Sequence, residues 1–332
     1  TIKQNTPLVT NIYTADPSAH VFDGKIYIYP SHDLDHECED NDNGDQYTME
    51  DYHILCMDDV DSECVDCGEV LHQDEVPWVS QQMWAPDCAY KNGKYYLYFP
   101  ARDKDGIFRI GVATSDTPAG KFTPEPDYIK GSFSIDPAVL VDDDGTGYLY
   151  FGGGTGTDSE HPKSTRVVKL GEDMCSLVSD PEELDPYYLF EDSEINKING
   201  TYVYSYCTNW KVPSGDETTG SCCIAFMTSD KPMSGFEYQK QLFANPGSVF
   251  GNYYNNHHKL IQFKGQWYII YHTTMLEETA YGTKQGYRTL HMDKLNVGKD
   301  SNGKLTIEAK ATYGGLSAVV QFNPYIECDA ST

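Results

Sequence analysis

A short pattern of alternating apolar residues recurs five times along the chain, each time directly after a glycine. The copies occupy residues 23–29, 92–98, 144–150, 199–204 and 264–271. In the first four copies, Asp or Asn precedes the glycine. Such a pair between apolar runs is typical of a hairpin turn, because type I′ geometry needs positive φ at both central positions. Each copy therefore predicts a tight turn followed by a β-strand.

Further apolar runs flank these turns and predict more strands. One run precedes each turn, at residues 19–22, 88–90, 138–141, 195–198 and 259–263. A third run follows at 109–114 and 223–228, and both of these end in a similar Ser-Asp-X-Pro segment. No long segment of helical periodicity intervenes. The pattern predicts repeated antiparallel units and an all-β fold class.

The spacing of the units predicts how they assemble. The turn glycines Gly24, Gly93, Gly145, Gly200 and Gly265 are separated by 69, 52, 55 and 65 residues. Five similar antiparallel units predict a five-bladed β-propeller around a central channel, whereas a two-sheet sandwich would not require five similar units. Although 332 residues suggest about two domains by length alone, we expect a single domain, residues 1–332, because the repeats fill the chain.

Charge narrows the classes of partner. The chain has 51 acidic and 24 basic residues and a formal net charge of −27. A surface this negative is repelled by phosphate backbones and anionic lipids, so we expect no nucleic-acid or membrane partner. Aromatic residues make up 13% of the chain, which is typical of a folded core and not of a disordered acidic tail.

The chain contains ten cysteines, more than is usual for a protein of the reducing cytosol. This number predicts some disulfides and a secreted or otherwise extracytoplasmic protein. Cys64 and Cys67 form a CxxC pair, but no second pair at zinc-ribbon spacing accompanies it. A disulfide or idle thiols in a surface loop is therefore favoured there over a zinc or redox site.

Four acids and one histidine occupy similar positions in the five units. They lie six to nine residues before the turn glycines, where the first strand of each blade enters the channel: Asp16, Asp87, Asp136, Glu191 and His257. An acid before proline often only caps a turn. Three or more converging acids are harder to explain in that way, because burying like charges together is costly.

Close carboxyl groups acquire different pKa values, so that one stays protonated as an acid while another is ionised as a base. Glycoside hydrolysis needs this pair: a proton donor to the leaving oxygen, and a base or nucleophile opposite it. The channel acids thus indicate a glycosidase.

Several segments, taken in order, resemble glycoside hydrolase family 43, whose members are five-bladed propellers. They are residues 15–25, 84–87, 135–138, 190–193, 268–272 and 287–293, followed by a closing segment at 311–315. The resemblance runs from about residue 7 to 325 and depends on the order and spacing of these motifs. It implies an inverting mechanism that needs no cofactor for the chemistry.

The resemblance also implies roles for individual residues. Asp16 would be the general base that activates water, and Glu191 the general acid that protonates the departing oxygen. Asp136 would orient Glu191 and raise its pKa through like charge. Glu194 is an alternative acid, but strand alternation is expected to turn it to the face opposite Glu191, and the motif favours Glu191.

Three further site residues follow from the resemblance. Arg288 would reach the sugar and tune the ionisation of the acids, with a surface ion pair as its alternative. Trp84 would stack on a sugar face, with packing in the core as its alternative. His257 would help to hold a calcium ion in the channel, mostly through water, because calcium prefers oxygen ligands.

The acidic stretch from Asp33 to Asp51 has a spacing near that of a calcium loop. The first position, Glu39, and the lack of flanking helices make it a poor EF-hand. Residues 31–35 resemble instead a rim loop of the family, so we expect a solvated loop at the mouth of the pocket.

The expected function is removal of α-L-arabinofuranosyl side chains from arabinoxylan or arabino-oligosaccharides of the plant cell wall. The alternative within the class is a β-xylosidase acting on xylo-oligosaccharides, since the two sugars present similar hydroxyls. A non-catalytic propeller that only binds glycan, or a module held together by calcium, is the alternative outside the class.

Overall fold

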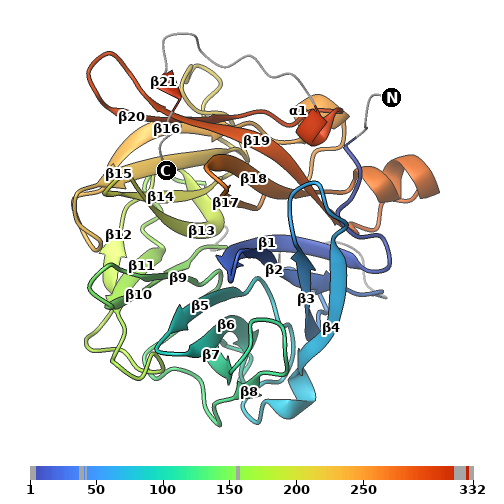
Figure 1. Cartoon of the computed structure of the whole chain (residues 1–332), viewed down its shortest axis with the longest axis vertical. Helices are drawn as coiled ribbons and strands as arrows, with labels where there is room; N and C mark the ends of the chain where they lie inside the picture. The colour runs from blue at the N-terminus through green and yellow to red at the C-terminus, as the bar shows by residue number, and fades with distance from the viewer. Residues whose placement is uncertain (1–4, 37–40, 42, 155–157, 318–326, 329–332) are drawn as a thin grey trace.

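The computed structural model describes residues 5–36, 41, 43–154, 158–317 and 327–328. Its sheets are arranged around five innermost strands, β1, β5, β9, β13 and β17, which contact one another in a ring (Figure 1). Each innermost strand begins an antiparallel sheet in chain order. The five-bladed β-propeller predicted from the repeats is therefore confirmed.

The strands of the five blades have the following bounds. Blade 1 is β1 (Tyr13–Phe22), β2 (Lys25–Asp33), β3 (Asp51–Met57) and β4 (Val65–His72). Blade 2 is β5 (Asp87–Lys91), β6 (Lys94–Arg102), β7 (Phe108–Ser115) and β8 (Thr123–Pro124). Blade 3 is β9 (Ala138–Val141), β10 (Gly147–Gly152), β11 (Thr165–Lys169) and β12 (Glu182–Leu184). Blade 4 is β13 (Leu189–Ile198), β14 (Thr201–Thr208), β15 (Ile224–Ser229) and β16 (Glu237–Phe243). Blade 5 is β17 (His258–Phe263), β18 (Gln266–Thr273), β19 (Thr289–Lys299) and β20 (Leu305–Ala309), with β21 (Glu327–Cys328) paired to β19.

Helical structure in the described residues is short. It comprises the α-helix α1 (Gly247–Phe250), 3₁₀ turns at Gln73–Glu75 and Gly315–Ser317, and a π-helical turn at Glu277–Tyr281. None of these helices is long and apolar enough to cross a membrane.

Four of the five predicted turns have the expected geometry. Positive φ occurs at both central residues of 23–24, 92–93, 199–200 and 264–265. The third turn is longer, because β9 ends at Val141 and β10 begins only at Gly147. The Asp144 carboxylate accepts a hydrogen bond from the Thr146 amide (2.9 Å) and holds this wider loop, in which Gly145 alone has positive φ.

The alternating apolar runs follow from the way in which each blade is buried on both faces. On β6, Leu97 and Phe99 pack against blade 1, while Tyr96 and Tyr98 pack against blade 3. The five hydrophobic clusters each lie between two neighbouring blades. One of them joins blade 5 to blade 1, for example through Ile270 and Ile28, and closes the ring.

Candidate active site

Asp16 lies on β1 at an interruption of the strand, where the register with β2 shifts between Ala15 and Ser18. Its carboxylate accepts hydrogen bonds from Ser31 Oγ (2.8 Å) and Arg288 Nη1 (3.0 Å). Burial alone would raise the pKa of Asp16, but the nearby Arg288, His257 and His272 hold it below the ordinary value for aspartate. Asp16 is therefore ionised, as a general base must be.

Glu191 lies on β13 and is half-buried. Burial, followed by the negative charge of Asp16, raises the pKa of Glu191 to about 7, while Asn255 and Arg288 act in the opposite direction. Asn255 Nδ2 donates a hydrogen bond to Glu191 Oε1 at 3.4 Å. The carboxyl group can therefore hold a proton near neutral pH, as a general acid requires.

A glycine makes room for Glu191. Gly153 has φ +131°, and a Cβ atom there would lie 2.7 Å from the Phe190 carbonyl oxygen and 2.9 Å from Glu191 Cα. Only glycine adopts this backbone conformation freely. The end of β10 thus fixes how closely blade 3 approaches the acid.

Asp136 comes just before β9 and is buried. Its Oδ2 accepts a hydrogen bond from the Asp192 amide (2.6 Å), the residue directly after Glu191. Burial, with repulsion from Glu191, raises the pKa of Asp136 well above its ordinary value. The contact holds the backbone beside Glu191, which is the geometry of an orienting residue.

Three of the buried acids have left-handed backbones: φ is 48° at Asp16, 54° at Asp136 and 71° at Asp192. This conformation is unfavourable for residues other than glycine and persists only where surrounding contacts hold it. The clustering of such residues marks this end of the channel as the functional site.

Arg288 is buried, with 1% of its surface exposed. Its Nε and Nη2 donate to the two carboxylate oxygens of Asp33 (2.9 and 2.7 Å), and Nη1 donates to Asp16. The guanidinium also lies 4.7 Å from the centre of the Tyr47 ring. The alternative of a surface ion pair is therefore wrong, and the contacts support an electrostatic role toward Asp16.

His257 bridges two carboxylates. Its Nδ1 lies 3.3 Å from Asp16 Oδ1, and its Nε2 lies 2.9 Å from Asp192 Oδ1. Burial lowers the pKa of His257 to about 4. Asp192 also accepts a hydrogen bond from the His258 amide (3.1 Å), so these residues form one buried network.

The position of Glu194 differs from the expectation that it faces the side of the strand opposite Glu191. Four residues of β13, from Glu191 to Glu194, lie opposite only three of β14, from Cys207 to Ser205. This bulge breaks the alternation that was expected to turn the two glutamates to opposite faces. Glu194 is buried toward the channel, where its Oε1 lies 2.6 Å from the Lys259 ammonium, so it is already paired.

Trp84 is half-buried. Its Nε1 donates to the Tyr47 carbonyl oxygen (3.0 Å), and its ring lies 4.5 Å from that of Phe108. These contacts tie the segment around Tyr47 to blade 2 and favour the packing role. Contact of Trp84 with a sugar stays a prediction.

The channel below the site contains a cavity of about 10 Å³, roughly the space for one water molecule. Residues with carboxyl oxygens that could bind a cation line the cavity, among them Asp87, Asp136 and Glu194. This donor set fits calcium. Because both ring nitrogens of His257 already face carboxylates, the imidazole fits the ion only through water.

The acidic stretch is described in part, and Glu39 lies outside the described residues. Asn41 Oδ1 accepts hydrogen bonds from the amides of Asn43 (2.9 Å) and Asp45 (3.3 Å). The Asn41 carboxamide therefore serves the turn of its own loop, which agrees with the weak EF-hand pattern.

Three residues that contribute to the site were not predicted from the sequence: Asp33, Asp192 and Asn255. Asp33 and Asp192 lie inside segments that carried the resemblance, 31–35 and 190–193, but neither has a periodicity or spacing that assigns it a partner. Arg288 and Asp33 are 255 positions apart. Only the closure of blade 5 onto blade 1 brings them together.

Comparison with known proteins agrees with this site. The model of glycosyl hydrolases family 43 matches residues 65–301. A xylosidase/arabinosidase 43A of Humicola insolens is 44% identical over 316 residues, covering 82% of this chain and 91% of the relative. A xylosidase/arabinosidase of Bacteroides ovatus is 40% identical, covering 91% of this chain and 97% of the relative.

Solved structures are similar over nearly the whole chain. CoXyl43, a β-xylosidase/α-arabinofuranosidase from a compost microbial metagenome, was solved with xylotriose in a calcium-free form. It is 39% identical, with a TM-score of 0.79, and the match covers 93% of this chain and 98% of that one. Enzymes of this family need no cofactor for their chemistry. The chain belongs to glycosyl hydrolase family 43 and is a glycoside hydrolase.

Proposed function

We propose that the protein is an inverting glycosidase that removes α-L-arabinofuranosyl side chains from arabinoxylan or arabino-oligosaccharides. The observation that carries the proposal is the opposite ionisation of two acids in one site. Asp16 is held ionised by Arg288, while burial keeps Glu191 protonated up to about pH 7. A glycosidase needs this division between an ionised carboxylate and a proton donor. The inverting mechanism is supported by membership of family 43.

In the proposed mechanism, the Asp16 carboxylate takes a proton from a water molecule as that water attacks the anomeric carbon. Glu191 gives its proton to the glycosidic oxygen as the bond to the anomeric carbon breaks. Asp136 holds the backbone beside Glu191, and Arg288 keeps Asp16 ionised. Exchange of protons with solvent then restores both groups.

A β-xylosidase acting on xylo-oligosaccharides is the second candidate. It is supported by a relative named β-xylosidase, from Xylanibacter ruminicola, and by CoXyl43, which was solved with xylotriose. Two relatives named arabinoxylan arabinofuranohydrolase, from Paenibacillus polymyxa and Bacillus subtilis, support the first candidate. The family and the three acids favour both over a non-catalytic module.

Proton NMR during hydrolysis separates the candidates. The purified protein is incubated with arabinoxylan and, in parallel, with xylo-oligosaccharides. Arabinose that first appears with inverted configuration supports the primary proposal, and inverted xylose from the oligosaccharides supports the second. A first product of retained configuration would overturn the assigned roles of Asp16 and Glu191.

The channel cavity is proposed to bind a calcium ion through oxygen ligands from Asp87, Asp136 and Glu194, with His257 contributing through water. Calcium would offset buried negative charge there and takes no part in proton transfer. Titration of calcium into chelator-treated protein, followed by the melting temperature, tests this role. An unchanged melting temperature would contradict it.

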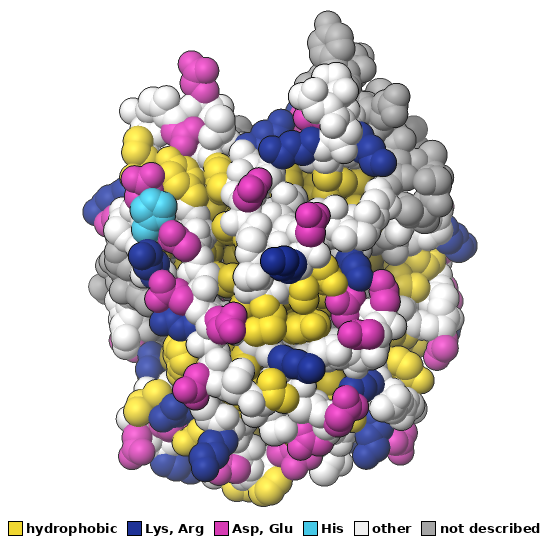
Figure 2. All heavy atoms as spheres, turned by 90° about the vertical axis from the view of Figure 1, so that its left-hand side faces the viewer, with side chains coloured by type: hydrophobic (Ala, Val, Ile, Leu, Met, Phe, Trp, Pro, Cys, Tyr) yellow, Lys and Arg dark blue, Asp and Glu magenta, His cyan; other side chains and the backbone are white. Residues whose placement is uncertain are grey.

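The proposal extends to the partner and the place of action. A plant cell-wall polysaccharide is too large to enter a cell, which supports an extracytoplasmic enzyme. Disulfides lend no support, because the eight cysteines whose side chains are described are all free. Cell fractionation tests the location. The lack of a nucleic-acid or membrane partner stays a prediction from the net charge of −27. On the face shown in Figure 2, basic side chains lie scattered among acidic ones.

The single-domain assignment of residues 1–332 also stays a proposal. It is supported by the solved relatives, since CoXyl43 matches over 98% of its own chain. Limited proteolysis followed by mass spectrometry tests it, because one domain should yield one resistant core.

A further inference from the structure

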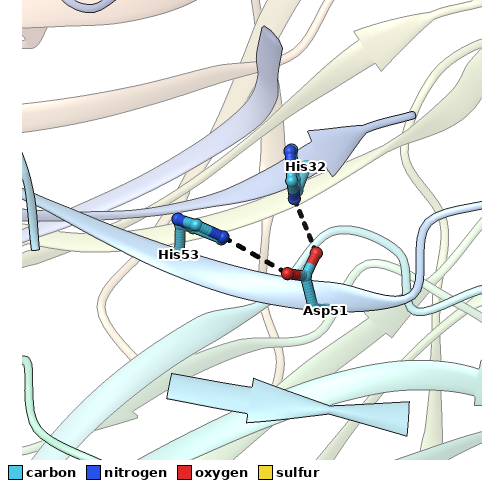
Figure 3. A group of neighbouring side chains, drawn as sticks. All are labelled: His32, Asp51 and His53. Atoms are coloured by element: carbon cyan, nitrogen blue, oxygen red, sulfur yellow. Dashed lines mark hydrogen bonds and ion pairs between the residues drawn. The ribbon is translucent and has the colours of Figure 1, made fainter. Parts of the chain in front are cut away.

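Blade 1 carries a cluster of two histidines and one aspartate away from the proposed acid and base. His32 comes from β2, and Asp51 and His53 come from the neighbouring strand β3 (Figure 3). The Asp51 carboxylate lies between the two rings, 2.6 Å from His32 Nδ1 and 3.3 Å from His53 Nε2. Between 10 and 18% of each side chain is exposed, so a small ion can reach the cluster.

A fourth side chain orients the cluster from outside. Both carboxylate oxygens of Asp66 on β4 lie within reach of His53 Nδ1, at 3.0 and 3.1 Å. Asp66 is itself fixed by Asn11 Nδ2 and the Gly68 amide, both at 2.8 Å. Histidines that bind metals usually donate their second ring N–H to a carboxylate, which fixes the ring and its tautomer. Asp66 gives His53 this support and leaves Nε2 directed toward Asp51.

The spacing of the donor atoms suits a small ion. One atom from each of the three side chains lies within 4.8 Å of the others. Tetrahedral zinc, with bonds of about 2.0 Å, holds its ligand atoms about 3.3 Å apart. His53 Nε2 and Asp51 Oδ2 already have this separation. His32 Nδ1 faces the other oxygen of Asp51, Oδ1, so the His32 ring would have to turn toward Oδ2 to complete the ligand set.

We propose that His32, Asp51 and His53 bind a divalent transition-metal ion of the zinc class. Two imidazoles and one carboxylate suit zinc and its neighbours, whereas calcium prefers oxygen ligands alone. The exposed Glu69, which pairs with His53 across β3 and β4, is placed to supply the fourth ligand. The site is separate from the channel cavity, none of whose lining residues belongs to it.

The ion would join β2 to β3 through its ligands, next to the candidate active site. The neighbours of His32 on β2 are Ser31 and Asp33, which contact Asp16 and Arg288. The metal would therefore stabilise the strand that supports the proposed base, without touching a reacting group. Its expected effect is on stability and not on the chemical step.

Calorimetric titration of the full chain tests this site. Chelator-treated protein is titrated with zinc alone and, separately, with calcium alone. We expect one zinc ion per chain, with loss of detectable zinc binding in His53→Gln and in His32→Gln. The matched control is His161→Gln, which removes an exposed histidine paired with Asp185 (3.1 Å) and should bind zinc as the wild type does.

A milder variant covers the case in which a ligand variant fails to fold. Asp66→Asn keeps all three ligands and should weaken zinc binding by about 10–100-fold. Circular dichroism and glycosidase activity verify folding. The proposal is overturned if the wild type binds no zinc, or if zinc binding is the same in the wild type, Asp66→Asn and whichever ligand variant folds.

Discussion

Arg288 Nη1 lies 3.0 Å from Asp16 Oδ1, and both side chains are buried. The other edge of the guanidinium is filled by Asp33, whose two oxygens accept from Nε and Nη2. The arginine is therefore held in place by one carboxylate while it acts on another. Asp33 is a positioning residue for the cation that keeps Asp16 ionised.

Replacing Arg288 by methionine should impair the proposed base through its ionisation. An opposite charge at this distance lowers the pKa of an aspartate by about 1–3 units. Loss of the arginine charge should therefore move the acidic limb of the pH profile of kcat/KM to higher pH by a similar amount. Arg288→Lys keeps a cation and should shift the limb less. The pH dependence of kcat/KM for all three proteins measures this.

A second arginine provides the control. Arg109 pairs with Asp103 at 3.2 Å in blade 2, away from the channel acids. Arg109→Met should leave the acidic limb where it is. An unmoved limb in Arg288→Met, or an equal shift in Arg109→Met, would contradict the proposed role.

The wild-type enzyme should lose activity as the pH rises through about 7. Burial raises the pKa of Glu191 to about 7, and only its protonated form can donate to the leaving oxygen. Above that value, kcat/KM should fall about tenfold per pH unit, because it follows the protonated fraction of the free enzyme. Asp16, with its lowered pKa, stays ionised across this range. A plateau extending to pH 9 would contradict the assignment of Glu191 as the acid.

The repeats predicted the propeller because local turn chemistry and burial on both faces leave a mark in the sequence. The turn at 23–24 and the residues after it carry both signals, and these come from contacts between near neighbours or between blades that follow one another. The third turn departed from the prediction because Thr146 adds to the loop without changing the apolar pattern. Local sequence patterns therefore predict the strands of the blades more accurately than the lengths of the loops.

Site residues were predictable only where a short sequence motif contained the functional side chain itself. Asp16, Asp136 and Glu191 were expected at the channel, and the structure brings them together. The bulge that directs Glu194 inward depends on how β13 pairs with β14, and periodicity along one strand does not reveal pairing. The contact between Arg288 and Asp33 depends on ring closure, which no spacing rule encodes.

Variants of the two glutamates on β13 should separate activity from stability. Glu191→Gln should lower kcat on xylan-type substrates by about 10²–10⁴-fold, the usual contribution of a general acid. The variant should keep its melting temperature. Because burial raises the pKa of Glu191, ionisation of this group destabilises the folded protein as the pH rises, and glutamine cannot ionise. On an aryl glycoside whose leaving group needs no proton, the loss of kcat in Glu191→Gln should be much smaller.

Glu194→Gln should behave in the opposite way. The variant leaves the Lys259 ammonium, only 4% exposed, without its partner at 2.6 Å. Breaking a buried pair costs about 3–5 kcal/mol of unfolding free energy. Denaturant unfolding and kcat measured together should show lost stability with kcat retained. Loss of kcat in stably folded Glu194→Gln, with Glu191→Gln unaffected, would exchange the roles of the two residues.

Gly153→Ala should displace the proposed acid without removing it. The new Cβ atom would lie 2.7 Å from the Phe190 carbonyl oxygen and 2.9 Å from Glu191 Cα, so the backbone of β13 must move. A shift of about 1 Å at a reacting group can cost about 100-fold in rate, and we expect a loss of this order in kcat. Gly93→Ala is the matched control, because Gly93 also has positive φ (+80°) but nothing lies within 4 Å of its Cβ position. Both variants should lose stability from backbone strain, and only Gly153→Ala should lose kcat. Equal kcat in the two variants would mean that the approach of blade 3 does not position Glu191.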